Sequence, residues 1–340
     1  MKPCRRSKVN GAVLSLLVIT VLWCLPSWGN AAQPIELKLG HTDNDTAVSP
    51  YQVTATKFAS LVEKYTNGKY KIAIFPNSQL GFEKEMVKNL TMGSMDFAVI
   101  TSSVIGPFIG SYMAIDLPFV FPNRETAHAV LDGEVGEKLL SQLSKLKIKG
   151  LGFGEVGFRH MINNVRPIKT PEDTKGIKFR VMQTPIYIGM FQNLGSNAVP
   201  MPFGELFTAL HQKVIDGAEL PLPIVQGNKF NEVTKYLSLT GHTYTCIGLM
   251  CSESRWNGLS ASEKEIFKRA ARETIVYERG FVKDTNEKNL EKLKAAGMIV
   301  NDIPDKKAFQ AVVSPLYKKF EGEIGKDVLD AFVKARDTKN

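Results

Sequence analysis

Two arginines in short apolar surroundings are the residues best suited to chemistry in this sequence. Arg180 lies in Gly176–Met182, a run that alternates like a strand, and Arg159 lies in Gly157–Met161. A guanidinium presents a rigid fork of donors that matches a carboxylate, and such charge-assisted hydrogen bonds are about twice as strong as neutral ones. Two guanidinium groups facing one cleft would bind a small organic acid. The alternative is that each arginine makes a weak ion pair at the surface.

Alternating strand and helix patterns would position these arginines. One unit is predicted to contain strands at 35–40, 70–75 and 96–101 and helices at 50–65 and 81–92. A second unit is predicted to contain strands at 178–182, 198–201 and 215–219 and helices at 185–194 and 203–212. This alternation predicts an α/β protein with parallel sheets covered by helices. Ligands of such sheets bind outside the carboxyl ends of the strands, where Arg180, Phe203 and Glu219 fall.

A very long helix is predicted after Leu259. Ser260 and Glu263 have the spacing of a capping box, and Gly297 suits the position just past the helix end. A helix of this length spans on the order of 50 Å. Its apolar spacing is not a sustained heptad, which favours one helix lying across two lobes over a coiled coil. Gly280 could permit a bend.

The first residues predict export. A positive start is followed by an apolar stretch at 11–25 that is too short for a comfortable membrane span, and Gly29 and Ala31 offer the small residues that a signal peptidase reads. We therefore predict a signal peptide at 1–31, cleaved after Ala31. The alternatives are an uncleaved anchor and a lipoprotein at Cys24, which the bulky Trp23 before it disfavours.

The charge and motif content argue against several classes of protein. Losing the four positive charges of the leader lowers the formal net charge from +9 to +5, and the remaining basic residues are interspersed with acids. This pattern does not indicate a nucleic-acid partner. The five histidines show no metal-binding spacing, and neither a Gly-x-Ser-x-Gly elbow nor a phosphate-binding glycine loop occurs. The sequence therefore predicts no enzyme, no cofactor and no metal.

Two cysteines, Cys246 and Cys251, remain after the leader. Their segment has the pattern of a strand, and a spacing of five puts the two side chains on opposite faces. Although export permits a disulfide, we expect two buried thiols instead.

Eight motifs in order along the chain resemble one known family. They are FPNSQLG at 75–81, GSMDFA at 93–98, DLPF at 116–119, GFRH at 157–160, PEDTKGIKFR at 171–180, PMPFGELFTAL at 200–210, VIDGAE at 214–219 and TGH at 240–242. Together they resemble the solute-binding proteins of tripartite ATP-independent periplasmic (TRAP) transporters, of the C4-dicarboxylate-binding (DctP) type. The resemblance covers nearly all of the mature chain.

The resemblance implies a two-lobed periplasmic-binding-protein-like fold with a ligand cleft between the lobes and a long helix spanning both. Lobe I would comprise 32–156 and 246–285, and lobe II would comprise 157–245 and 286–340. A length of about 300 mature residues agrees with two domains. Such a protein binds an organic acid in the periplasm, closes on it, and delivers it to the membrane subunits of a transporter. We expect a monomer. A ligand-presenting sensor protein is the alternative.

The resemblance also assigns the site. The arginine matching Arg180 makes the main salt bridge to the ligand carboxylate, and the one matching Arg159 commonly adds to it. The other expected ligand-binding residues lie at strand or helix ends, and they are His41, Thr42, Glu83, Gln183, Phe203, Glu219 and Leu220. Several have a structural alternative: His41 and Phe203 could be core residues, Glu83 and Gln183 could serve a helix start, and Glu219 could orient an arginine, the role we favour.

Leu220 departs from the family pattern. Many relatives have an asparagine there that touches the ligand, whereas a leucine cannot donate a hydrogen bond. Two other cleft positions, Thr101 and Val104, are uncharged. These residues favour a monocarboxylate with an apolar or aromatic part, while a C4-dicarboxylate and a sugar acid stay open. Phe179 and Met182 are expected in the core.

Overall fold

One ten-stranded sheet runs through the computed structural model, which describes residues 1, 3 and 33–338. Its strands are β1 (Ile35–Gly40), β2 (Tyr70–Phe75), β3 (Phe97–Thr101), β4 (Ile148–Asn163), β5 (Lys178–Val181), β6 (Asn197–Pro200), β7 (Gly217–Pro221), β8 (Tyr236–Leu239), β9 (Tyr244–Ser252) and β10 (Ile299–Asp302). The main order is β2-β1-β3-β9-β4-β7-β5-β6, and β8 pairs with both β4 and β10.

The long strand β4 joins the two halves of the sheet. Its residues 148–158 pair with β9, and its residues 159–163 pair with β7. The first half contains the parallel strands β1, β2 and β3, and the second contains the parallel strands β5, β6 and β7. Register shifts interrupt β4 between Gly150 and Gly152 and between Glu155 and Gly157. Arg159 is therefore the first residue of β4 to pair with the second half.

Helices cover the sheet on both halves. The α-helices are α1 (Pro50–Tyr65), α2 (Glu83–Met92), α3 (Arg124–Leu131), α4 (Glu134–Gln142), α5 (Pro185–Asn193), α6 (Leu206–His211), α7 (Leu222–Gly227), α8 (Glu253–Asn257), α9 (Ala261–Ala295), α10 (Lys306–Val313), α11 (Pro315–Ile324) and α12 (Lys326–Asp337). Short 3₁₀ turns include η1 (Ser102–Ile105), η2 (Gly110–Asp116) and η5 (Phe203–Glu205). None of the helices in the described part of the chain is long and apolar enough to cross a membrane.

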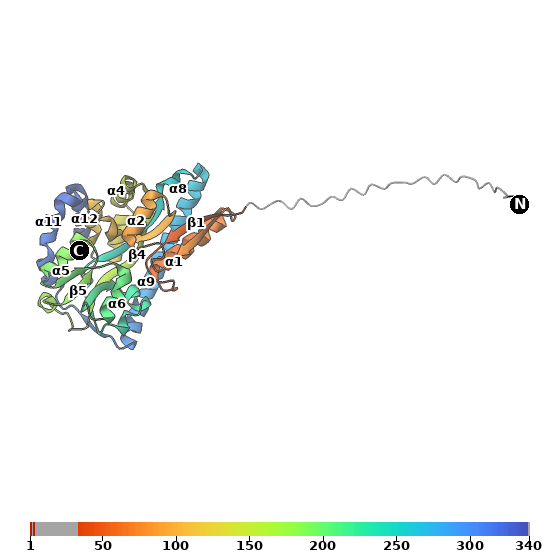
Figure 1. Cartoon of the computed structure of the whole chain (residues 1–340). Helices are drawn as coiled ribbons and strands as arrows, with labels where there is room; N and C mark the ends of the chain where they lie inside the picture. Colours follow the sequence, from red (N-terminus) through yellow and green to blue (C-terminus); the bar gives the residue numbers. More distant parts are fainter. Residues whose placement is uncertain (2, 4–32, 339–340) are drawn as a thin grey trace. The chain divides into compact units, whose positions relative to one another are not determined.

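The helix α9 is the longest element and connects the halves. Its 35 residues correspond to about 50 Å. Ser260 and Glu263 form the predicted capping box, and Gly297 follows the helix end with a φ of +92°. The helix continues through Gly280 without interruption. It packs against α1 and β4, which are labelled near it in Figure 1, and also against α7, and thus against elements of both halves.

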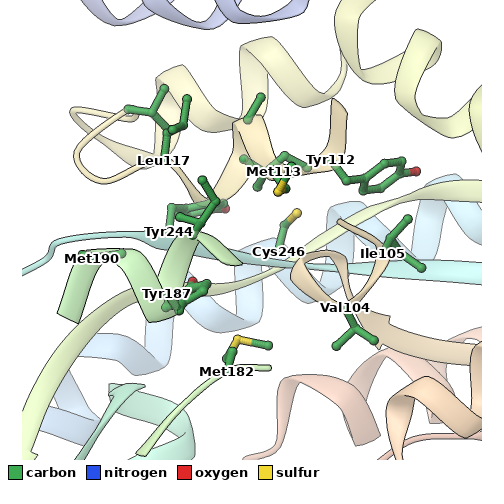
Figure 2. Packing of buried hydrophobic residues seen from close by; sticks show 14 of the residues in the cluster. Val104, Ile105, Tyr112, Met113, Leu117, Met182, Tyr187, Met190, Tyr244 and Cys246 are labelled. Atoms are coloured by element: carbon green, nitrogen blue, oxygen red, sulfur yellow. The ribbon is translucent and has the colours of Figure 1, made fainter. Parts of the chain in front are cut away.

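Two buried apolar clusters hold the elements together. One cluster joins η1 and η2 to α5, and Figure 2 shows Val104, Met182 and Tyr187 packed near Cys246 within it. The other cluster lies between α1, β3 and α9, where the rings of Phe97 and Phe267 stack with centroids 5.7 Å apart. Burial of the residues on these facing surfaces contributes the main stabilisation of the fold.

The α/β class and the long spanning helix are confirmed, while several boundaries differ from prediction. The helix predicted at 81–92 begins at Glu83, because Gly81 adopts a φ of +98°. The strand predicted at 215–219 lies at Gly217–Pro221, and the helix predicted at 203–212 begins as a 3₁₀ turn before α6. Cys246 and Cys251 are both buried free thiols, as predicted.

Two further predictions are not decided by the fold. The signal peptide and its cleavage after Ala31 lie outside the described residues. The lobe boundaries stay a prediction: α11 and α12 in the expected second lobe both pack against η2, and α11 also packs against α5.

Replacing Phe267 by alanine should strongly destabilise the fold. The ring contacts Phe58, Tyr70 and Phe97, so truncation leaves a cavity between α9 and the first half-sheet. We expect a loss of about 3–5 kcal/mol in the free energy of unfolding, measured by urea denaturation. Val276→Ala is a matched control on the same helix, because Val276 is 73% exposed. Equal effects of the two substitutions would contradict this packing.

Candidate functional site

A cavity with an empty volume of about 410 Å³ lies between the two halves of the sheet. The first half contributes residues after β1 and at the end of β3, and the second contributes residues of β5 and β7. The lining residues are Thr42, Asp43, Tyr51, Glu83, Thr101, Val156, Arg159, Arg180, Met182, Phe203, Leu220, Pro221, Ile224 and Thr245. Its position at strand carboxyl ends is where open α/β sheets bind ligands.

Arg180 places a buried positive charge without an ion-pair partner in this cavity. Its side chain is only 3% exposed, and Nε and Nη2 donate to the main-chain carbonyl of Met201 at 2.9 and 2.7 Å. Within residues 33–338, no carboxylate lies at ion-pair distance from it. Burial lowers the pKa of Arg180 to about 10, so the guanidinium stays charged at neutral pH. A buried charge without a partner is costly, and an anionic ligand would relieve that cost.

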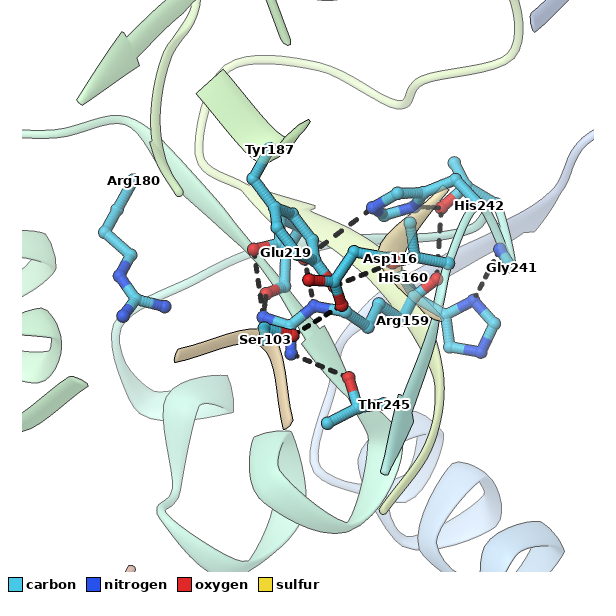
Figure 3. Close-up of polar contacts among 12 residues, drawn as sticks. Ser103, Asp116, Arg159, His160, Arg180, Tyr187, Glu219, Gly241, His242 and Thr245 are labelled. Atoms are coloured by element: carbon cyan, nitrogen blue, oxygen red, sulfur yellow. Dashed lines mark hydrogen bonds and ion pairs between the residues drawn. The ribbon is translucent and has the colours of Figure 1, made fainter. Parts of the chain in front are cut away.

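Arg159 is also buried, but its charge is already balanced. Its Nε and Nη2 donate to the carboxylate of Glu219, whose side chain is fully buried, and Nη1 donates to Thr245 Oγ1 at 3.0 Å. The guanidinium also lies over the ring of Tyr187, 5.3 Å from the centroid. Figure 3 shows these contacts as one network, with Arg180 apart from it.

Arg159 and Glu219 shift each other's pKa. Burial alone would raise the pKa of Glu219, but the Arg159 charge overrides burial and lowers it. Burial would likewise lower the pKa of Arg159, and Glu219 raises it. Glu219 therefore stays ionised and fixes Arg159, which is the orienting role favoured from the sequence.

Further buried polar groups surround the Arg159 pair. His242 Nε2 lies 3.6 Å from Glu219 Oε2, which is too long for a direct hydrogen bond, and burial lowers the pKa of His242. Asp116 accepts a hydrogen bond from Ser103 Oγ, and burial raises the pKa of Asp116 to about 7. These groups surround the arginine rather than line the cavity (Figure 3).

Two carboxyl groups face the cavity from the first half. Thr101 donates from both its main-chain N and its Oγ1 to Oε1 of Glu83, each at 2.7 Å. Asp43 accepts from Ser49 Oγ and from Asn228 Nδ2. Burial raises the pKa of both Glu83 and Asp43. These groups can accept hydrogen bonds from hydroxyl groups, and they would repel an anion placed beside them.

The rest of the wall is mainly apolar. Its apolar members are Val156, Met182, Phe203, Leu220, Pro221 and Ile224. Leu220 is buried and faces this cavity rather than only the core, and Phe203 packs edge-on against Phe230. Among its described residues, the cavity therefore combines one guanidinium without an ion-pair partner, two carboxyl groups that can accept hydrogen bonds from a hydroxyl, and an apolar surface.

The structure brings most of the predicted site residues together. Those that line the cavity are Thr42, Glu83, Arg159, Arg180, Phe203 and Leu220. Gln183 lines an adjoining hollow that shares Arg180 and Glu83 with the cavity, and Val104 also lines it. His41 lies behind the wall, where its Nε2 is 2.7 Å from Gln52 Oε1. Glu219 lies behind Arg159.

Several cavity residues were not predicted from the sequence. Met182 was expected in the core and is buried, but it also lines the cavity. Asp43 and Tyr51 were missed, although Asp43 follows the end of β1 and could have been found with Thr42. Tyr51 Oη lies 2.6 Å from Thr101 Oγ1, so α1 reaches the site from its first turn. No local pattern indicated Tyr51, Ile224 or Thr245.

Comparison with known proteins identifies close relatives. Residues 40–323 match the family described as bacterial extracellular solute-binding protein, family 7. A solute-binding protein of Verminephrobacter eiseniae is 37% identical over 84% of this chain and 85% of its own length. A sugar acid binding protein of Advenella mimigardefordensis, solved with galactonate, has a TM-score of 0.87 and 34% identity and covers 91% of this chain and 99% of its own.

A second solved structure is similarly close. A TRAP periplasmic solute-binding protein of Bordetella bronchispeptica, with density interpreted as pantoate, has a TM-score of 0.85 and 37% identity. It covers 90% of this chain and 99% of its own.

Glu219→Gln should weaken the fold strongly at neutral pH, because it leaves the buried Arg159 without its counter-charge. Breaking a buried pair typically costs about 3–5 kcal/mol. The measurement is the melting temperature and urea midpoint of both proteins. Glu273→Gln is a matched control, because Glu273 pairs with Arg269 on the surface. Exposed pairs contribute about 0–1 kcal/mol, so a similar loss in the two variants would contradict the buried pair.

The cost of Glu219→Gln should depend on pH. The folded pKa of Glu219 is lowered from its usual 4.5, so its contribution is complete above about pH 4.5 and is lost as the pH falls through the lower folded value. The stability difference between the natural protein and Glu219→Gln should therefore be constant near neutral pH and shrink in acid. A difference that stays unchanged in strong acid would contradict this assignment.

Proposed function

This chain belongs to family 7 of the bacterial extracellular solute-binding proteins, which bind organic acids for TRAP transporters, and we propose that its own ligand is a hydroxylated monocarboxylate with an apolar part. The proposal rests chiefly on Arg180, whose buried charge has no carboxylate partner among the described residues. In the proposed complex, the ligand carboxylate is the missing partner of Arg180 and forms a forked pair with its guanidinium.

The charges of the cavity favour a single ligand carboxylate. Arg159 is paired with Glu219, which leaves Arg180 as the one cation of the described cavity without an ion-pair partner. Asp43 and Glu83 face the same space and would repel a second carboxylate. A C4-dicarboxylate would therefore bind only with one of these groups protonated, or with its second carboxylate outside the cavity.

The remaining walls favour a hydroxyl group and an apolar part on the ligand. Glu83 receives both Thr101 bonds on Oε1, so its Oε2 can accept from a ligand hydroxyl. Leu220 and Ile224 offer apolar contact on the other side. A fully hydroxylated sugar acid would leave hydroxyl groups unpaired against this surface, at a cost of about 1–3 kcal/mol each. The relatives solved with galactonate and with density interpreted as pantoate represent these two chemistries.

Family membership supports the following proposal for the wider role. The chain is exported with cleavage after Ala31, acts in the periplasm as a monomer, and delivers its acid to the membrane subunits of a TRAP transporter. Binding without turnover is its whole activity. The two halves of the sheet move as lobes, I (32–156 and 246–285) and II (157–245 and 286–340), and closure buries the ligand.

A thermal-shift screen of the mature protein tests the ligand class, because a ligand that binds only the folded state raises the melting temperature. Pantoate represents a branched hydroxy acid, D-galactonate a polyhydroxy acid and succinate a dicarboxylate. We expect the largest shift with pantoate and the smallest with succinate. A larger shift with succinate would favour the dicarboxylate alternative, and a larger one with D-galactonate would favour the sugar-acid alternative. No shift with any organic acid would contradict the proposed function.

Arg180→Ala should abolish or severely weaken binding of the acid while the protein still folds. Removing one partner of a desolvated charge pair typically costs about 2–5 kcal/mol, or roughly 30- to several-thousand-fold in affinity. Arg180→Lys should also weaken binding, because a point charge cannot form the fork. Isothermal titration calorimetry measures both. Arg166→Ala is the matched control, since Arg166 also donates to main-chain carbonyls but lies outside the cavity. Affinity retained in Arg180→Ala would refute the carboxylate pair.

Leu220→Asn should change the ranking of ligands. The substitution removes apolar contact worth about 1–3 kcal/mol and adds an amide that can pair with a hydroxyl. Affinity for pantoate should fall, and affinity for D-galactonate should rise relative to it. Calorimetry gives the ranking, and the melting temperature separates a specificity change from a loss of stability. A lower melting temperature with an unaltered ranking would show that Leu220 serves only the core.

A further inference from the structure

Two asparagines fasten the segment after β1 to α7 at the rim of the cavity. Asn44 Nδ2 donates to the main-chain carbonyl of Gly227 at 2.8 Å. Asn228 Nδ2 donates to Oδ1 of Asp43, also at 2.8 Å. The two bonds run in opposite directions between neighbouring residues, so each segment supplies one donor and one acceptor.

These bonds connect opposite halves of the sheet. The segment 41–49 follows β1 in the first half, and α7 follows β7 in the second. Asp43 and Ile224, one from each segment, line the cavity, whereas Asn44, Gly227 and Asn228 do not. The bonds therefore cross the cavity rim without occupying the ligand space.

Gly227 lets the two segments approach closely. A Cβ atom at position 227 would lie 3.3 Å from Val48 Cγ2, a contact that is tighter than usual and would require a small displacement. Asn44 and Thr46 are also close to this point. A residue without a side chain at the end of α7 thus permits the main-chain carbonyl to reach Asn44.

Without the bonds made by Asn44 and Asn228, Asp43 would still be held by a residue of its own half. Ser49 Oγ donates to its Oδ2, and both residues belong to the first half. The contact from Asn228 reaches the other oxygen from the second half. Asp43 therefore has one partner that is independent of how far the halves are apart and one that requires them to be closed.

We propose that Asn44 and Asn228 form a latch that closes this rim of the cavity over the bound acid and completes the positioning of Asp43. This inference rests on the proposed function, in which the halves close on a carboxylate. The bonds form on closure and break before release, so they slow dissociation more than they speed association. Asn44 and Asn228 are positioning residues that do not touch the ligand.

Dissociation kinetics test the latch with defined acids. In stopped-flow measurements with pantoate and with D-galactonate, Asn44→Ala and Asn228→Ala should each dissociate about three- to tenfold faster, with a smaller change in association. Asn164→Ala is the matched control, since Asn164 donates to the carbonyl of Val233 away from the rim, and it should leave both rates unchanged. Unchanged dissociation in both latch variants would overturn the proposal.

Two checks separate the latch from a structural role. Asn228 also donates to the carbonyl of Ile224, so Asn228→Ala could weaken α7 itself. Asn44→Ala leaves that bond intact and should give the same kinetic effect. Asn228→Asp keeps the side-chain size but opposes Asp43 with a second carboxylate, so it should dissociate faster than Asn228→Ala. An effect confined to Asn228→Ala would assign the residue to helix stability and overturn the latch.

A distance measurement tests the latch without depending on any acid. Spin labels at Asp45→Cys, in the segment after β1, and at Glu232→Cys, shortly after α7, report the separation of the two sides of the rim, and the two cysteines of the described chain, Cys246 and Cys251, are buried. Without any acid present, the labelled double variant Asn44→Ala/Asn228→Ala should show a smaller share of short label-to-label distances than the labelled parent that keeps both asparagines. Identical distributions would overturn the latch. If the variant differs but neither acid changes the parent's distribution, the proposed function fails while the latch stands.

Discussion

The buried charge of Arg180, which has no ion-pair partner among the described residues, is the constraint on which the proposed site depends. A guanidinium buried at the end of β5 has only the Met201 carbonyl to bind within the protein, and a carbonyl offers a dipole rather than a charge. Arg159 differs, because Glu219 balances it fully. Two chemically identical side chains in one cavity thus differ in their partners: Arg159 is paired with Glu219, whereas Arg180 has no ion-pair partner among the described residues, and we propose that a ligand anion fills this role.

The scaffold is arranged around the same constraint. Strand β4 runs through both halves of the sheet and carries Arg159 at the point where its pairing changes from β9 to β7. The helix α9 packs against both halves. Residues of both halves line the cavity, so a ligand that contacts both halves would favour their closed arrangement.

The sequence predicted the classes of element well, because strand alternation, capping residues and glycines are local signals. The capping box at Ser260 and the terminating Gly297 fixed the ends of α9 to within a residue or two. That Glu219 orients an arginine was favoured from the sequence, but which arginine it contacts was harder to predict. Arg159 and Glu219 are 60 residues apart, and Asn44 and Gly227 are 183 apart. Such contacts depend on the pairing of strands from different parts of the chain, which no local spacing encodes. Met182 shows the same limit of sequence-based prediction. Its apolar pattern predicted a core residue, and its side chain is buried, but it also lines the cavity.

The most direct measurement is a crystal structure of the mature protein with pantoate bound. The account predicts one ligand carboxylate in a forked pair with the Arg180 guanidinium, with N–O distances of about 2.7–2.9 Å, while Arg159 remains paired with Glu219. The ligand hydroxyl should lie beside Glu83 or Asp43, and the branched carbon part should lie against Leu220. A carboxylate bound to another group, with Arg180 still contacting only the Met201 carbonyl, would contradict the central claim.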